Sequence, residues 1–256
     1  MAKTENRSLS WKRPSGPPKI WKRFEINEKT GSEGKDGKVL RFSIEEIPTD
    51  RYDEVLDLIV NNFMADEPLC RCLNIKDDPA GVEDFRNFWQ LSLKQGISVG
   101  LFLDDSDIDK REIVGANVLL VLTHEDEELF DEVKFKSAAA ETIINFVMNA
   151  TAETNVLDHY KVDKYISALG LVLIPRFRGY SLGGHILGVR NDIGQEYKIP
   201  VTETAFTGTA SQILAQRNGF EVLLVKKYSE AYDSDGQLLF PNVDCECAKM
   251  MAKRLY

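Results

Sequence analysis

The chain has 256 residues, of which 43% are hydrophobic and 29% are charged, and its formal net charge is −9 at pH 7. This is an ordinary composition for a globular protein, and it excludes a collagen-like or disordered main body. An acidic chain also argues against non-specific nucleic-acid binding, which depends on Lys and Arg. We therefore expect a folded protein with no nucleic-acid partner.

The apolar stretches have the length of strands and not of membrane spans. The stretch at 116–122 is typical, and a spanning helix needs about 20 apolar residues. The first residues carry charge but lack the apolar segment of a secretory signal. Four Cys are too few for a disulfide framework in a chain of this length. These features predict a cytoplasmic protein without a membrane span.

The N-terminal segment differs in composition from the rest of the chain. Residues 1–24 are rich in Lys and Arg, and their three prolines exclude a regular helix. We interpret this segment as an extended basic arm, and we favour a solvated tail over a contact with a partner. Trp11 and Trp21 nevertheless indicate that part of the arm packs back on the body. The composition of 30–38 is typical of a turn or flexible connection.

From residue 39 onward, strand and helix patterns alternate. The strand patterns cover 39–47, 97–103, 112–123, 166–174, 199–205, 220–228 and 243–252. Helical periodicity begins near Thr49 and then covers 81–94, 137–158, 181–195 and 208–217. This pattern predicts an α/β (mixed α+β) fold. The chain then divides into an arm and linker at 1–38 and one domain at 39–256.

The strongest local pattern is a buried strand followed by a Gly-rich loop and a helix. Gly179, Gly183 and Gly184 allow a ligand to approach the backbone closely, and Arg176 and Arg178 add positive charge. The first N–H groups of a helix lack intrahelical partners and attract anions. A phosphate site and a tight turn that only helps the helix pack are equally supported by the loop alone.

Three segments together resemble a known family. Residues 178–183, RGYSLG, resemble the acetyl-CoA pyrophosphate loop of the GNAT acetyltransferase superfamily, Arg/Gln-x-x-Gly-x-Gly/Ala, with Ser181 where a Gly is usual. Residues 62–69, NFMADEPL, resemble a segment of the insect arylalkylamine N-acetyltransferase-like branch. Residues 207–220, TGTASQILAQRNGF, resemble its hydroxyl-bearing helix. These segments occur in the family's order along the chain.

The resemblance implies a fold, an acyl donor and a set of site residues. It implies a GNAT-like fold whose mixed, mostly antiparallel sheet is flanked by helices and splays between 166–174 and 199–205 to admit acetyl-CoA. It gives Glu67 the role of general base, and it gives Thr207 and Ser211 the functional hydroxyls. The implied cofactor-binding residues are Leu173, Ile174, Arg178, Gly179, Tyr180, Ser181, Leu182, Gly183, Gly184 and Ser211.

These assignments agree with the chemistry of acetyl transfer to an amine. An alkylammonium has a pKa near ~10, as Lys has, so a carboxylate such as Glu67 is needed to remove a proton before attack. Backbone N–H groups of 171–174 would bind the oxyanion if the strand splays from its neighbour. Ser211 would then serve the leaving thiolate. In isolation, Glu67 and Ser211 are each better explained as surface side chains, and the joint order of the motifs favours the catalytic interpretation.

The predicted activity is acetyl transfer from acetyl-CoA to a small-molecule primary amine. The favoured acceptor is an arylalkylamine such as dopamine, tyramine, octopamine or serotonin. One alternative is a non-catalytic module on the same fold that binds acyl-CoA or a partner, which would not need Glu67 and Ser211. A further alternative is an acyltransferase for a polyamine, an amino acid or a protein Lys. The sequence does not choose among these acceptors, because acceptor pockets are built from variable loops.

Several other residues have two interpretations. Phe63, Phe88 and Trp89 are candidates for an arylalkyl pocket, although core positions are favoured. The acidic segments 104–109 and 125–132 would attract a cationic amine or simply form a solvated rim. The two Cys-x-Cys pairs offer four thiols, but we favour core thiols and expect no metal site, because C-x-C is not the common zinc spacing. Those four residues are Cys70, Cys72, Cys245 and Cys247.

Overall fold

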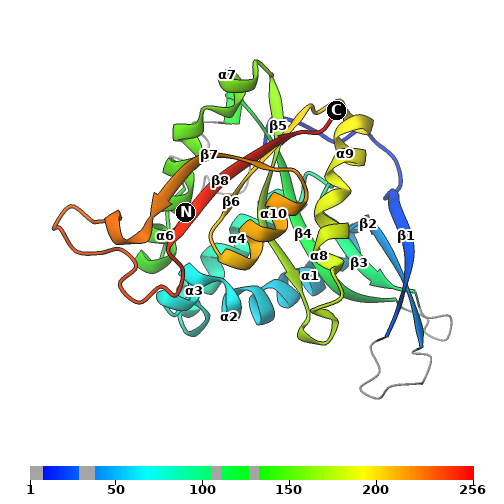
Figure 1. Ribbon diagram of the computed structural model, residues 1–256, viewed down its shortest axis with the longest axis horizontal. Helices are drawn as coiled ribbons and strands as arrows, with labels where there is room; N and C mark the ends of the chain where they lie inside the picture. The colour runs from blue at the N-terminus through cyan, green and yellow to red at the C-terminus, as the bar shows by residue number, and fades with distance from the viewer. Residues whose placement is uncertain (1–7, 29–37, 105–110, 127–132) are drawn as a thin grey trace, which may run out of the picture.

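The computed structural model describes residues 8–28, 38–104, 111–126 and 133–256 (Figure 1). Within these ranges, eight strands form one sheet in the order β1-β2-β3-β4-β5-β6-β8-β7. Neighbouring strands are antiparallel except β5 and β6, which run parallel. The predicted mixed, mostly antiparallel sheet is therefore confirmed. The strands are β1 (Ile20–Asn27), β2 (Val39–Glu46), β3 (Val99–Leu103), β4 (Glu112–Thr123), β5 (Lys164–Leu173), β6 (Val201–Phe206), β7 (Glu221–Lys227) and β8 (Cys247–Arg254).

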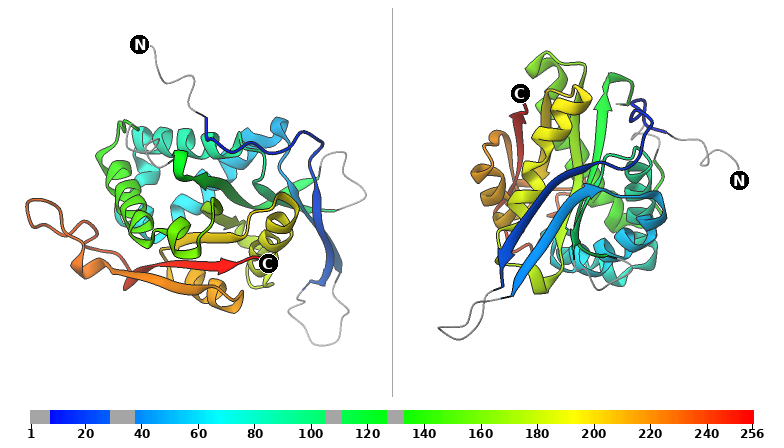
Figure 2. Two further views of the ribbon diagram at one scale, coloured as in Figure 1. Left: turned by 90° about the horizontal axis from the view of Figure 1, so that it is seen from above. Right: turned by 90° about the vertical axis from the view of Figure 1, so that its right-hand side faces the viewer.

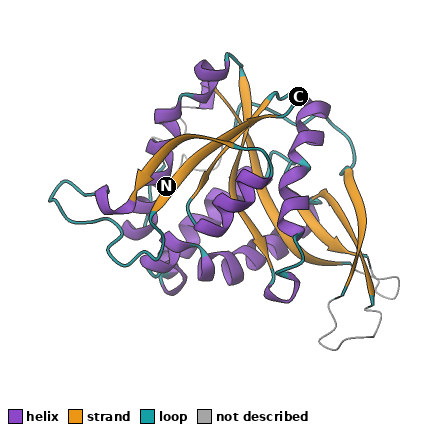
Figure 3. Cartoon of the chain, in the orientation of Figure 1, coloured by secondary structure: helices purple, strands orange, loops and turns teal. Residues whose placement is uncertain are grey.

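Helices cover both faces of the sheet (Figure 3). One face packs against α1, α3, α4 and α6, and the other packs against α8, α9 and α10. Burial between two helical layers explains why β4 reads as a nearly continuous apolar run, with its residues from Ile113 to Leu122 all buried. The helices are α1 (Tyr52–Leu58), α2 (Met64–Asp66), α3 (Pro68–Cys72), α4 (Pro79–Leu93), α6 (Ala138–Thr154), α7 (Val156–Tyr160), α8 (Leu182–Gly188), α9 (Arg190–Tyr197) and α10 (Thr209–Arg217).

Two predicted helices are divided in the structure. The helix expected over 137–158 begins after Ser137, whose side chain accepts a hydrogen bond from the Ala140 N–H. It ends at Asn155, which has a left-handed backbone with φ +43°, and α7 follows. The helix expected over 181–195 likewise forms α8 and then α9, with Val189 between them. The last strand begins at Cys247, four residues later than expected.

The interpretation of the N-terminal arm as a solvated tail is wrong for the described part of the arm. Residues 20–27 form β1, which pairs antiparallel with β2 and lies at one edge of the sheet (Figure 2). Leu9 is buried in a cluster with residues from β4 and α7. The expectation that the arm packs back is confirmed, because the rings of Trp11 and Trp21 both contact Tyr197 edge-on.

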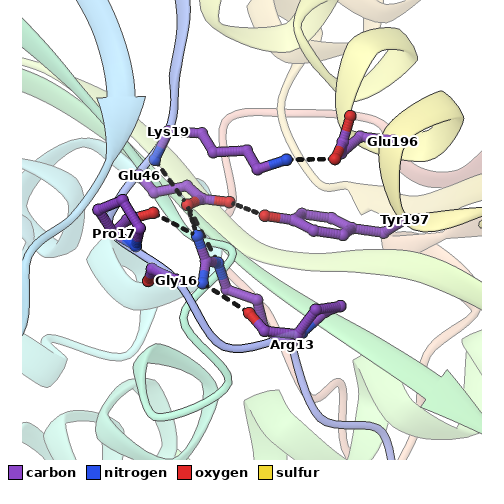
Figure 4. Close-up of polar contacts among 8 residues, drawn as sticks. Arg13, Gly16, Pro17, Lys19, Glu46, Glu196 and Tyr197 are labelled. Atoms are coloured by element: carbon purple, nitrogen blue, oxygen red, sulfur yellow. Dashed lines mark hydrogen bonds and ion pairs between the residues drawn. The ribbon is translucent and has the colours of Figure 1, made fainter.

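A buried carboxylate fastens this segment to the body (Figure 4). Glu46, at the end of β2, accepts hydrogen bonds from the Arg13 guanidinium at 2.6 and 3.0 Å and from the Lys19 backbone N–H at 2.8 Å. Its other oxygen accepts from the Tyr197 hydroxyl of α9 at 2.6 Å. Lys19 also forms an ion pair with Glu196. The residues that flank β1 are therefore tied to both β2 and α9.

Some expectations fall outside the residues described above. Most of the predicted connection at 30–38 and most of the acidic segments 104–109 and 125–132 belong to this group. Cys70 and Cys247 are buried, as expected for core thiols, and Cys72 and Cys245 are half-buried. In the described part of the chain, no three His, Cys, Asp or Glu residues are grouped so that they could hold a metal ion. Nor does any described helix combine the length and apolarity needed to cross a membrane.

Candidate active site

The sheet opens between β5 and β6. Among the described residues, the one register pair that joins these strands is Ile166 with Thr202. Beyond it the strands part, and a cavity passes between them with walls from both helical layers. Its apolar walls include Phe63, Phe85, Phe88, Trp89, Ile143, Val147, Leu169, Leu187, Phe206 and Leu214. The splayed cleft expected between 166–174 and 199–205 is therefore present.

Glu67 lies in this cavity because Pro68 interrupts the helix. A residue that precedes proline disfavours the α conformation, and Glu67 is extended, with φ −67° and ψ 127°. It therefore ends α2 and caps α3, and its carboxylate accepts a hydrogen bond from the Cys70 N–H at 2.6 Å. The Thr207 hydroxyl donates a second bond to this carboxylate at 2.6 Å. Glu67 is 8% exposed.

Thr207 and Ser211 reach the same cavity from the end of β6 and from α10. The Tyr228 hydroxyl donates to the Thr207 carbonyl oxygen at 2.7 Å, which fixes the backbone there. The Ser211 hydroxyl donates to the Gly208 carbonyl oxygen at 2.8 Å. The fold thus brings all three predicted functional side chains to one cavity, and it joins Glu67 and Thr207 directly.

The ionisable neighbours of Glu67 are held in their protonated forms. Burial raises the pKa of the Cys70 thiol well above its ordinary value, and the charge of Glu67 and its hydrogen bond raise it further. Burial also raises the pKa of Tyr228, again with a contribution from Glu67. Both groups therefore remain neutral donors near pH 7.

The end of β5 presents backbone groups to the split. The Ile174 N–H donates to the Val114 carbonyl oxygen of β4 at 3.0 Å. Because successive N–H groups of a strand point to opposite sides, the N–H of Leu173 points away from β4, toward the side from which β6 has parted. Of the two predicted cofactor contacts, the Leu173 N–H therefore faces the split, whereas the N–H of Ile174 already donates a hydrogen bond within the sheet.

The Gly-rich loop lies between β5 and α8. Gly179 has φ +81° and Ser181 has φ +60°, so both residues occupy the left-handed region that favours glycine. Arg178 forms a 2.6 Å ion pair with Asp66, next to Glu67, and also donates to the Leu173 carbonyl oxygen. Tyr180 is half-buried beside this turn. The loop is thereby tied to the segment that carries the predicted base.

The remaining loop residues begin helix α8. Leu182 and Gly183 are buried, and a Cβ at Gly183 would come within 3.2 Å of the Leu214 side chain of α10. Gly184 also faces α10, and its N–H donates to the Ser181 carbonyl oxygen at 3.1 Å. In the part of the chain described here, no side chain caps the first turn of α8. Glycine at 183 therefore serves close helix packing as well as the loop.

Three polar residues of the cavity, Arg190, Asn117 and Thr204, were not predicted from the sequence. Arg190 is 1% exposed, and Asn117 lies in the middle of the apolar strand β4. A signal for Arg190 was present in the sequence. With Leu182 and Ile186 it follows a spacing of four residues, which places a charged residue on the buried face of the predicted helix. A charge on such a face requires buried partners.

Known structures can be compared with this fold. No protein-family model and no curated protein matches the chain. A solved mosquito structure, assigned as arylalkylamine N-acetyltransferase 7 of Aedes aegypti, superposes with a TM-score of 0.85 at 26% identity over 96% of this chain and 100% of its own. The chain has the GNAT fold of the insect arylalkylamine N-acetyltransferases. The family resemblance found in the sequence is therefore confirmed.

Two more distant structures share the fold. Arylalkylamine N-acetyltransferase 2 of Aedes aegypti has a TM-score of 0.72 at 22% identity, covering 84% of this chain and 99% of its own. A Drosophila melanogaster polyamine N-acetyltransferase, described as forming N-acetylagmatine, has a TM-score of 0.69 at 17% identity, covering 83% and 99%. At these identities the likeness concerns the fold alone, so the choice of amine rests on the cavity itself.

Proposed function

We propose that this protein is an acyltransferase that moves an acetyl group from acetyl-CoA to the primary amine of an arylalkylamine. The observation that carries the proposal is the contact between Glu67 and Thr207 at the wall of an aromatic cavity that passes through the split sheet. This contact supports the proposal because the Glu67 carboxylate lines the cavity in which an amine would meet a thioester inserted between β5 and β6. A non-catalytic binding module would have no need of that carboxylate.

The walls of the cavity favour an arylalkylamine as the acceptor. Phe63, Phe88 and Trp89 line it, so they are both core residues and pocket walls, and the Trp89 ring contacts the Phe63 ring edge-on at 6.1 Å. Among the described lining residues, Glu67 is the one acid. A polyamine carries a second cation, which would be left without a partner in these apolar surroundings at a large free-energy cost.

The opposite side of the split suits coenzyme A. The diphosphate would lie against the loop of Gly179 and Ser181 and the uncapped first turn of α8, where backbone N–H groups favour anions. Arg178 lies at the same loop, where Asp66 and the Leu173 carbonyl oxygen hold its guanidinium. The pantetheine arm would then follow β5 into the split, with the N–H of Leu173 on its path. These features support acetyl-CoA as the acyl donor.

The chain's own groups would then perform the transfer. Glu67 accepts a proton from the ammonium, and the neutral amine nitrogen attacks the thioester carbonyl carbon. The carbonyl oxygen becomes an oxyanion, which the free side of β5 stabilises through its N–H groups. Collapse breaks the C–S bond, and the departing thiolate accepts a hydrogen bond from the Ser211 hydroxyl, released from Gly208, and takes the proton that the attacking nitrogen loses. The proton on Glu67 passes to solvent. The products are an N-acetylated amine and coenzyme A.

Glu67→Gln tests the assignment of the base. The amide keeps the size of the side chain but cannot accept a proton, so kcat with tyramine or dopamine should fall by about 10²–10⁴-fold, while coenzyme A still binds. Thiol release and calorimetry measure the two quantities. Glu83→Gln, on the exposed side of α4, is the matched control and should keep full activity. Equal activity of Glu67→Gln and wild type would refute the role of Glu67.

A panel of amines tests the acceptor. The value of kcat/KM should be at least about tenfold higher for tyramine, dopamine and serotonin than for agmatine or spermidine, because an unpartnered second cation is rejected. The reverse order would identify a polyamine acetyltransferase. If the wild-type protein bound coenzyme A but turned over no amine, the binding-module alternative would replace the proposal.

A further inference from the structure

A buried arginine lies at the base of the split. Arg190 is the first residue of α9, and its guanidinium donates to the Asn117 Oδ1 from Nε at 3.3 Å and from Nη2 at 3.0 Å. Its Nη1 donates to the hydroxyls of Thr202 at 3.0 Å and Thr204 at 2.8 Å. All three acceptors are neutral. A fully buried cation held by neutral oxygens has a high desolvation cost, which suggests a role beyond packing.

These bonds connect strands on the two sides of the split. Asn117 belongs to β4, while Thr202 and Thr204 belong to β6. The Thr202 hydroxyl donates to the Ile166 carbonyl oxygen of β5 at 2.8 Å, at the register pair where β5 and β6 meet. Arg190 therefore fixes the relative positions of three strands at the point from which the split widens.

The same network sets the orientation of one peptide in β5. The Asn117 side chain donates from Nδ2 to the Gly170 carbonyl oxygen at 2.8 Å. The register of β4 and β5 shifts here, and Gly170 has φ +123°, which a residue with a side chain rarely adopts. In a trans peptide the N–H points opposite to the carbonyl. The N–H of Leu171 is therefore directed away from Asn117 and β4, and Leu171 lines the cavity.

The charge at this point is positive near neutral pH. Burial lowers the pKa of Arg190 to about 9, so its guanidinium stays charged. Glu203 precedes Thr204 on β6 and, by the alternation of a strand, faces the opposite side of the sheet. Burial raises its pKa to about 8, although the Arg190 charge opposes that rise. Glu203 is then mostly protonated at pH 7, and it does not neutralise the guanidinium.

We propose that Arg190 is a positioning residue for acyl transfer: through Asn117 and the Gly170 carbonyl it holds the Leu171 N–H toward the reacting thioester. This inference rests on the proposed function: it selects the Leu171 N–H among those of β5 and adds the side chains that aim it. The reaction itself is unchanged: the bond from nitrogen to carbon forms, and the C–S bond breaks.

Arg190→Met tests the role in turnover. The variant should lower kcat by about 10²–10³-fold, on the scale of one lost oxyanion donor, with the KM for tyramine and the affinity for coenzyme A within about threefold of wild type. Arg190→Lys restores charge without the planar fork and should recover part of kcat. Arg51→Met replaces another buried arginine, one outside the cavity, and should keep full kcat. An unchanged kcat in Arg190→Met would overturn the proposal, as would a loss that matches a loss of coenzyme A affinity.

Asn117→Ala provides the second variant, because it leaves Arg190 bonded to both threonines. Its kcat should fall to a similar level, and adding Arg190→Met should cause little further loss, since both act on one peptide. Strictly multiplicative losses would show that Arg190 does not act through Asn117. Asn117→Ala also answers the question if Arg190→Met fails to fold, because full activity in Asn117→Ala would contradict the proposal.

A readout without turnover separates this inference from the proposed function. In a ¹⁵N–¹H spectrum, acetyl-CoA should shift the amide resonance of Leu171 in the wild type, and it should no longer do so in Asn117→Ala, although other resonances of the cavity still move. A protein that turns over no amine but shows this pattern would refute the acetyltransferase assignment and retain the aimed amide. An active wild type whose Leu171 resonance does not respond would refute the aimed amide alone.

Discussion

Two buried glutamates, Glu46 and Glu203, occupy contrasting environments in the same sheet. Glu46 is 1% exposed and accepts bonds from Arg13, Lys19 and Tyr197. Glu203 is fully buried, yet within the described ranges neither of its carboxyl oxygens has a hydrogen-bond partner. The first environment stabilises a charge, and the second disfavours it. Glu46 therefore secures the N-terminal segment, whereas Glu203 leaves the positive charge of Arg190 available at the cleft.

The contrast also concerns what each region contributes. The N-terminal segment adds β1 and an aromatic contact at Tyr197, and these interactions lie away from the cavity. The cleft instead contains a buried cation, Arg190. Close to it, Ser181 has a left-handed backbone in the loop before α8, and Glu203 of β6 has an unpartnered carboxyl group. Stabilising interactions thus concentrate in the segment that secures the sheet edge, and the unfavourable ones concentrate near the proposed chemistry. Functional sites commonly carry such strain.

The largest expected effect is at Glu46. Glu46→Ala leaves the Arg13 guanidinium, which is 11% exposed, without its carboxylate, and breaking such a pair should lower the free energy of unfolding by about 3–5 kcal/mol. Urea unfolding measures this change. Removing both charges in Arg13→Met with Glu46→Leu should recover most of the loss, because no buried charge then remains. A loss below about 1 kcal/mol in Glu46→Ala would show that the pair behaves as a surface salt bridge.

Glu203→Gln should raise the free energy of unfolding, in contrast to Glu46→Ala, and the size of this effect should depend on pH. The pKa of Glu203 is about 8 in the folded protein, against an ordinary value of 4.5, so between these values the folded state binds the additional proton. The contribution of Glu203 to the free energy of unfolding is therefore complete below pH 4.5. It decreases as the pH rises toward 8, by up to about 1.4 kcal/mol per pH unit. The groups that act on Glu203 are Arg190 and Tyr160.

The variant lacks this titration, so it should become the more stable protein as pH rises. Between pH 5.5 and pH 7.5 the difference in unfolding free energy should grow in its favour by about 2.5 kcal/mol. Urea unfolding of both proteins at the two pH values provides the comparison. An equal difference between the two unfolding free energies at both pH values would mean that the pKa of Glu203 is not raised. Glu203 and Glu46 would then differ only in their hydrogen bonds.

The sequence predicted the buried strands better than the edge strand. The run at 112–123 corresponds to β4, Glu112–Thr123, because a central strand is apolar on both faces. Strand β1 was missed since its residues are half-buried at most, and the adjacent Lys22 and Arg23 interrupt the alternation of polar and apolar side chains beside a proline-rich stretch. The pairing with β2 that makes it a strand is a tertiary property. Basic composition alone suggested a tail.

The same limit applies to the candidate site. The resemblance named Glu67 and Thr207, but their contact joins residues 140 positions apart and follows only from the way β6 passes the end of α2. The splayed cleft was expected for the same reason. Arg190 was overlooked because its partners, Asn117 and Thr204, come from two other strands. Local patterns identify candidate residues, and the tertiary arrangement decides which of them meet.

The smallest expected effect is at Ser181, and it tests whether strain in the cleft has a function. A residue with a side chain at φ +60° costs about 1–2 kcal/mol, and glycine at position 181 would remove this cost. Because glycine also has more freedom in the unfolded chain, part of that gain is lost, and Ser181→Gly should stabilise the protein by about 0.5–1 kcal/mol. Lys198→Gly, at φ +56° after α9, is the matched control and should give a similar gain. Thermal unfolding measures both variants.

Affinity for coenzyme A then separates the two positions. Without a Cβ at 181, the backbone amides of the loop can approach a diphosphate more closely, and affinity should rise by about threefold in Ser181→Gly, equivalent to about 0.7 kcal/mol. Lys198→Gly lies outside the loop and should leave the affinity unchanged. Equal affinities in wild type and both variants, measured by calorimetry, would remove the loop from the coenzyme A site. Since the diphosphate contact positions the thioester in the split, that result would also remove the main support for the donor side of the proposed reaction.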